Sequence, residues 1–216
     1  MWLSPRLAAG YSGRSRGNAA VFRCARLNRG HSGYERRMEG GRSSGSGFNT
    51  ATAPPAKAFG LLYGIGLGGF VDGIVLHQIL QWHHMISDVD GYPTTTVAGL
   101  EANTLADGFF HVATWACLVA ASSFAISSWQ RGRLAPTWRF HLGLLLTGWG
   151  VFNVVEGLVN HQLLGVHHVR DDLGAPLSWD IGFLIFGLTL LVAGWAVHRA
   201  GARALAELSS AHSGRQ

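Results

Sequence analysis

The sequence has few charged residues and only two cysteines. Asp, Glu, Lys and Arg make up 13% of its 216 residues, while hydrophobic residues make up 48%. Soluble domains carry roughly 25% charged residues, so this composition suits a surface that faces lipid. Cys24 and Cys117 lie far apart and form no C-x-x-C motif, which excludes a disulfide framework and a thiolate zinc site. Any chemistry must therefore use imidazole and carboxylate groups.

The basic net charge of +5 does not indicate nucleic-acid binding. Ten of the 17 Lys and Arg residues lie in the first 57 positions, and the rest of the chain has more acids than bases. This basic segment is rich in Arg, Gly and Ser and shows no aromatic stacking pattern. We therefore expect no nucleic-acid partner.

Three segments follow from the pattern along the chain. Residues 1–57 are predicted to be a disordered basic tail, because no apolar period persists there. The tail has no apolar core of a secretory signal, and Met38 is an alternative start. Residues 58–200 are predicted to be an integral membrane domain, and residues 201–216 a C-terminal tail.

Four apolar stretches in the middle segment are each near the ~20 residues that a helix needs to cross a bilayer. They cover residues 59–80, 105–127, 140–164 and 179–197. The frequent glycines of the first stretch are tolerated where helices pack closely in lipid. The predicted fold is all-α, a bundle of four transmembrane helices.

The distribution of basic residues predicts the orientation. The N-terminal tail is basic, and Arg131, Arg133 and Arg139 lie around the second connection. Basic ends stay in the cytoplasm. We therefore expect a multi-pass protein of the bacterial cytoplasmic membrane with both termini inside.

A 13-residue motif occurs twice. Residues 72–84 read DGIVLHQILQWHH, and residues 156–168 read EGLVNHQLLGVHH, so that each acid and histidine returns 84 positions later. Chance rarely produces such a match, and the sequence therefore indicates two duplicated helix pairs. Asp107 and Asp180 begin the second helix of each pair, but His111 has no counterpart after Asp180.

The predicted topology brings these polar groups together at the outer side of the membrane. The first and third helices end in the histidines, and the second and fourth begin with the aspartates. On a straight α-helix Asp72 lies about 140° around from His77, at ~100° per residue, so one metal ion could not easily bind both. A stripe of His77, Gln81 and His84 is expected to face the site.

Imidazole is the commonest ligand for transition metals and also binds haem. Paired histidines and acids within a membrane are costly unless they are used. The predicted ligands are the histidines of the motif and the acids that begin the second and fourth helices: His77, His83, His84, His111, His161, His167, His168, Asp107 and Asp180. Supporting or proton-carrying roles are expected for Asp72, Glu156, Gln78 and Gln162.

The run GFVDGIVLHQILQWHHM at residues 69–85, with its echo EGLVNHQLLGVHH, resembles the bacterial predicted membrane protein family called domain of unknown function 2243. The resemblance covers roughly residues 58–200. It implies a link to cytochrome oxidase assembly, and hence to the handling of copper or haem and to respiratory oxidase assembly proteins as partners.

The predicted function is therefore binding of a transition metal (copper, iron or zinc) or haem, in cofactor handling for respiratory oxidases. A membrane metal-dependent oxidoreductase is an alternative, since clustered histidines also serve in membrane di-iron enzymes. A proton-coupled transporter is another, although four helices offer a small pathway unless the chain forms a homo-oligomer. The lipid bilayer is the expected partner in each case.

Overall fold

The computed structural model describes residues 55–214. The first helix, α1 (Ala58–Asp72), continues as the π-helix η1 (Gly73–Ile79), and α3 (Trp138–Glu156) continues as the π-helix η2 (Gly157–Leu164). The other long helices are α2 (Val97–Gln130) and α4 (Leu177–Ser213), and a short 3-10 helix, η3 (Asp171–Leu173), precedes α4. The tail predicted for residues 1–57 lies almost entirely outside the described residues.

The described residues form four helices that are long and apolar enough to cross a membrane. They contain 22, 34, 27 and 37 residues, against the ~20 needed to span the hydrocarbon. The expected all-α fold with four transmembrane helices is confirmed.

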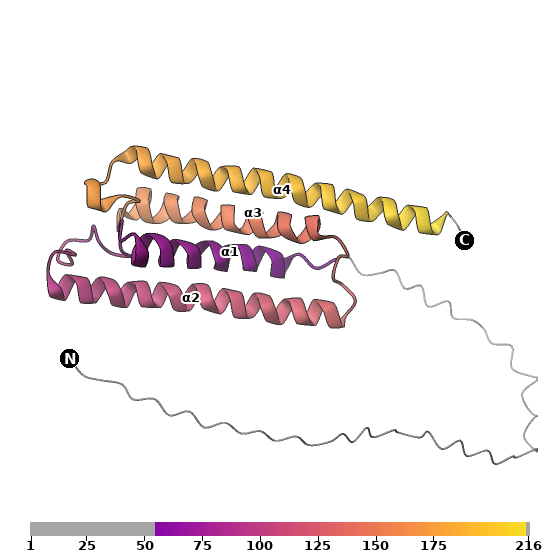
Figure 1. Ribbon diagram of the computed structural model, residues 1–216, viewed down its shortest axis with the longest axis horizontal. Helices are drawn as coiled ribbons and strands as arrows, with labels where there is room; N and C mark the ends of the chain where they lie inside the picture. Colours follow the sequence, from indigo (N-terminus) through magenta and orange to yellow (C-terminus); the bar gives the residue numbers. More distant parts are fainter. Residues whose placement is uncertain (1–54, 215–216) are drawn as a thin grey trace, which may run out of the picture. The chain divides into compact units, whose positions relative to one another are not determined.

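The four helices follow the order α2, α1, α3, α4 in space (Figure 1). The central helices α1 and α3 pack against each other, α2 packs against α1, and α4 packs against α3, whereas α2 and α4 do not pack together within the described residues. Large apolar side chains such as Phe109, Trp115 and Val192 are exposed on the outer helices. These faces suit contact with lipid.

Glycines allow the central helices to approach closely. A Cβ on Gly64 of α1 would lie 2.0 Å from the carbonyl oxygen of Leu145, and a Cβ on Gly148 of α3 would lie 2.1 Å from that of Leu61. Neither position can hold a side chain at this separation. Gly64 and Gly148 are 84 positions apart, as are the two copies of the motif.

Two helices are longer than predicted. The second span begins at Val97 rather than near residue 105, because the Thr96 hydroxyl accepts a hydrogen bond from the Gly99 N–H and caps the helix. The fourth continues through residues 201–213, which were predicted to form a tail. That segment is rich in Ala and Leu, which are strong helix formers.

Candidate metal centre

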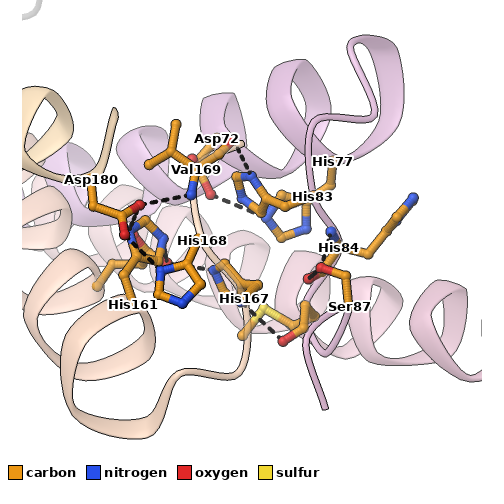
Figure 2. A network of polar contacts seen from close by, with 12 residues as sticks. Asp72, His77, His83, His84, Ser87, His161, His167, His168, Val169 and Asp180 are labelled. Atoms are coloured by element: carbon orange, nitrogen blue, oxygen red, sulfur yellow. Dashed lines mark hydrogen bonds and ion pairs between the residues drawn. The ribbon is translucent and has the colours of Figure 1, made fainter. Parts of the chain in front are cut away.

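The centre lies where η1 and η2 follow α1 and α3, beside the start of α4 and the part of α2 around Asp107, ten residues after its first residue (Figure 2). The acids of the two motifs end the α-helical parts, and a π-helical turn follows each of them. A π-helix pairs residue i with residue i+5, so it brings Asp72 and His77 to the same face. The straight-helix prediction for this pair was therefore wrong: Asp72 Oδ2 lies 3.3 Å from His77 Nε2. In the second motif Glu156 Oε1 lies 3.0 Å from His161 Nε2.

The chain turns back on itself directly after each π-helix. Gln81 and Gly165 occupy corresponding positions and both have positive φ, +49° and +55°. Glycine adopts this left-handed conformation without strain, whereas for glutamine the conformation is energetically unfavourable. The reversal breaks the expected stripe of His77, Gln81 and His84, because the helix has ended before Gln81. The reversal also brings His83 and His167 back toward His77 and His161, at the ends of the two π-helices.

His83 and His167 each form a hydrogen bond with the backbone of the other half of the protein. His83 Nδ1 donates to the carbonyl oxygen of Val169 over 3.1 Å, and His167 Nδ1 donates to that of Met85, also over 3.1 Å. Nε2 of His167 lies 2.8 Å from Glu156 Oε1, within hydrogen-bond distance. A carbonyl oxygen can only accept a hydrogen bond, so Nδ1 of each ring carries a proton, and in His83 Nε2 of the neutral ring keeps its lone pair. This is the tautomer that a metal ligand requires.

The rings of four histidines form one buried cluster. His83 and His167 stack in parallel with centroids 4.7 Å apart. His77 lies 4.5 Å from His83, and His161 lies 4.9 Å from His167, both edge to face. All four residues are at most 2% exposed. The cluster thus repeats the same arrangement in both halves.

Two sets of donor atoms in this cluster are close enough to share an ion. One set is His77, His83 and His167, and the other is Glu156, His161 and His167; within each set the ligand atoms all lie within 4.8 Å of one another. His167 belongs to both sets. The cluster is therefore one continuous group of possible ligands.

Asp107 and Asp180 hold the histidines from outside the cluster. Asp107 accepts hydrogen bonds at 2.7–2.9 Å, and its donors are the rings of His77 and His84, the Gln78 amide and the Met85 N–H. Asp180 has the corresponding set of neighbours: it accepts from His168, Gln162 and the Val169 N–H, while His161 Nδ1 lies 3.5 Å away. Both aspartates act as orienting groups, as carboxylates often do for metal-binding histidines.

Five of the predicted ligands lie outside the two donor sets, namely Asp107, Asp180 and three histidines. His84 and His168 use Nδ1 to bind Asp107 and Asp180, and so fasten the loops to α2 and α4. His111 packs beside Phe70 and Phe110, and its Nε2 is buried without a hydrogen-bond partner among the described residues. The predicted supports Gln78 and Gln162 do contact the orienting aspartates.

Several contributing groups escaped the sequence analysis. The backbone oxygens of Met85 and Val169 carry no side-chain signal, yet they fix the tautomers of two histidines. The rings of Phe110 and Phe183 lie 5.5 and 5.3 Å from those of His77 and His161. Phe110 follows Asp107 by three positions, and Phe183 follows Asp180 by three positions. This equal spacing is the only sequence signal that could have identified the two phenylalanines.

Unpaired atoms in the cluster favour a bound cation. Side-chain atoms that are buried without hydrogen-bond partners include Nε2 of His77, His83 and His161, together with Asp72 Oδ2 and Glu156 Oε2. Burying such groups unpaired is costly. Burial, together with the neighbouring imidazoles of His167 and His77, lowers the pKa of His83 well below its usual range, so that its ring stays neutral. The donor set fits an ion that prefers imidazole and carboxylate.

Fold and site together define a four-span membrane protein with a buried cluster of histidines and carboxylates at one end. Residues 59–201 match the model of a family described as predicted membrane protein (DUF2243), and the chain belongs to this family. The resemblance seen in the sequence is thereby confirmed. No curated protein and no solved structure matches the chain.

Proposed function

We propose that the protein binds a transition-metal ion in the cluster of His77, His83, His161 and His167. The observation that carries this proposal is the convergence of ligand atoms within 4.8 Å in each donor set. Nε2 of His77, His83 and His161 makes no hydrogen bond among the described residues, and those of His77 and His161 lie 3.3 and 3.0 Å from the carboxylates of Asp72 and Glu156. Each ring is anchored or approached at Nδ1 by an acceptor outside the cluster, so that Nε2 faces the cluster. Nε2 of His167 lies 2.8 Å from Glu156 Oε1, which belongs to the same donor set.

Charge balance supports a cation at this place. Four carboxylates surround the histidines and are at most 6% exposed: Asp72, Asp107, Glu156 and Asp180. Buried charges are normally paired or bound to metal ions. A divalent cation, or protons on the histidines, supplies the compensating positive charge.

The chemistry of the donor atoms limits which metal ions the cluster can bind. Imidazole and carboxylate together suit zinc, iron or Cu(II), whereas Cu(I) prefers soft sulfur ligands. The two donor sets contain no sulfur atom. Haem fits less well, because its axial ligands lie on opposite faces of a flat macrocycle, whereas these nitrogens converge on one small volume.

The correspondence between the halves supports an origin by duplication of a helix pair. The hydrogen bonds of Asp107 and Asp180, the crossed bonds to Met85 and Val169, and the glycine contact of α1 with α3 all recur at matching positions. A role in cofactor handling for respiratory oxidases rests on the family resemblance, and an oxidoreductase activity would use the same centre.

Metal analysis with X-ray absorption spectroscopy tests the proposal on full-length protein purified in mild detergent without a histidine tag. The expected result is a stoichiometric transition metal with nitrogen and oxygen neighbours at about 2.0–2.2 Å and no sulfur neighbour. A Soret band would show that the bound cofactor is haem rather than a single metal ion. Protein that stays metal-free after incubation with zinc, iron or copper would refute metal binding and favour the proton-carrying alternative.

A further inference from the structure

A second feature of the molecule is an apolar cleft that lies over α3, between α1 and α4. Its volume is about 420 Å³, within the range of small-molecule sites. Its walls are mostly aromatic and aliphatic side chains, and they include Trp82, Trp149, Trp179, Phe183 and Phe186. We call it the α1/α4 cleft.

The two halves of the protein differ in sequence where this cleft lies. Gly68 of α1 lines the cleft, and its counterpart 84 residues later is Phe152. The Phe152 ring lies 6.1 Å from that of Phe110 and packs close to Gly68 and Gly69. A phenylalanine therefore occupies space on one side of the protein, while a glycine leaves the matching space open on the other.

Two buried polar side chains line this otherwise apolar cleft. Asp72 and Asn153 are 6% and 3% exposed. Asp72 Oδ2 lies 3.3 Å from His77 Nε2, whereas Asn153 Oδ1 has no hydrogen-bond partner among the described residues. Gly69 stands at the position that corresponds to Asn153, so the other half lacks this amide. Water is scarce at this depth in a membrane, which makes an unpaired acceptor costly.

We propose that the α1/α4 cleft binds an apolar, membrane-soluble molecule that carries a hydroxyl group, an alcohol or a phenol. The body of the ligand packs on the tryptophans, and its hydroxyl donates a hydrogen bond to Asn153 Oδ1. An anionic head is disfavoured because it would meet the Asp72 carboxylate. The site is separate from the proposed metal ligands, although Asp72 lies between the two.

Binding is tested with a matched pair of probes, 2-bromo-4-hexylphenol and its methyl ether, on full-length protein in lipid nanodiscs. Bromine quenches tryptophan fluorescence on contact, and three tryptophans line the cleft. The expected result is saturable quenching by the phenol, with about tenfold weaker binding of the ether, because the ether leaves a buried acceptor unpaired. Equal binding of both probes would mean a cleft filled by any apolar molecule and would overturn the proposal.

A pair of glycine variants locates the binding. A Cβ on Gly182 meets no atom within 4 Å and lines the cleft, so Gly182→Leu should fill it and abolish the saturable quenching. Gly108 of α2 is equally open but lies outside the cleft, and Gly108→Leu should leave the quenching unchanged. Quenching that survives in Gly182→Leu, or disappears in Gly108→Leu, would place the phenol elsewhere and refute the assignment. The readout is fluorescence, so it does not depend on a bound metal.

Discussion

His83 and His167 lie face to face, with their ring planes only 3° apart, and each donates its Nδ1 proton to a backbone carbonyl of the other half. The two copies of the motif therefore meet in one cluster of side chains. The loop of each half completes the cluster by reaching across to its counterpart. This exchange makes the integrity of the centre depend on both halves at once.

The first prediction concerns this shared pair. His167 belongs to both donor sets, and His83 belongs to one of them. If the sets hold one ion, either His83→Ala or His167→Ala should lower the bound metal at least tenfold, as measured by metal analysis of the purified variants. If His83→Ala keeps half of the metal while His167→Ala loses all of it, the cluster holds two ions.

The control for these variants comes from the chain itself. Leu184 stands where His111 would recur in the second half, since both residues follow their aspartates by four positions. His111→Leu removes a buried histidine outside both donor sets, and it should retain full metal content. Loss of metal in His111→Leu would show that His111 is a metal ligand, as the sequence analysis predicted.

The second prediction separates orienting groups from ligands. Asp107→Asn replaces one acceptor oxygen by an N–H₂ group that faces donors, so it should lower metal affinity about 10- to 100-fold while the ligands stay in place. Asp180→Asn should have a smaller effect, because His161 Nδ1 lies 3.5 Å from Asp180, against 2.8 Å between His77 and Asp107. Metal titration by competition with a chelator measures both, and equal losses would contradict this ranking.

Much of this architecture could be predicted from the sequence, because the lengths of the apolar stretches and the spacing of the motifs can be read directly from it. The sequence alone was enough to predict the four spans and the meeting of His77 and His161 where the helices come together. The π-helical turns after Asp72 and Glu156 did require it, since periodicity assumes ~100° per residue throughout. The crossed bonds to Met85 and Val169 were equally invisible, because backbone carbonyls are the same at every position.

The third prediction tests the glycine contact between the central helices. Gly64→Ala would place a Cβ 2.0 Å from a backbone oxygen, which must force α1 and α3 apart and cost about 1–3 kcal/mol or more. Gly108→Ala is the matched control, since its Cβ meets no atom within 4 Å and alanine favours the helix by about 0.5–1 kcal/mol. Unfolding in mixed micelles should show a loss for Gly64→Ala only, and an unchanged Gly64→Ala would disprove the close approach.

The fourth prediction concerns Asp171, in the loop before α4. Burial raises its pKa above the usual 3.8, even though its carboxylate accepts hydrogen bonds from the Ser87 hydroxyl and the His168 N–H. The folded state therefore holds the proton more tightly than the unfolded state. The resulting stabilisation is full below the unfolded pKa and is lost as the pH rises through the folded pKa.

Asp171→Asn removes this titration but keeps an amide of similar shape. The stability of the wild type relative to Asp171→Asn should therefore fall as the pH rises from 3.8 through the raised pKa of Asp171 in the folded protein, and then level off. Thermal unfolding of both proteins in detergent across this range measures the difference. A difference that does not change with pH would show that the carboxyl group is not perturbed by burial.

The final prediction fixes the side of the membrane on which the centre lies. Arg131, Arg133 and Arg139 lie around the α2–α3 connection, at the end of the helices opposite to the histidine cluster. Because basic connections stay in the cytoplasm, the cluster should face the outside. In a cysteine-free background, Thr95→Cys should react with a membrane-impermeant maleimide on intact cells, and Gln130→Cys should react only after permeabilisation. Both positions are exposed in the folded chain, so accessibility depends on the membrane alone. The reverse labelling pattern would place the histidine cluster on the cytoplasmic side and overturn the predicted orientation.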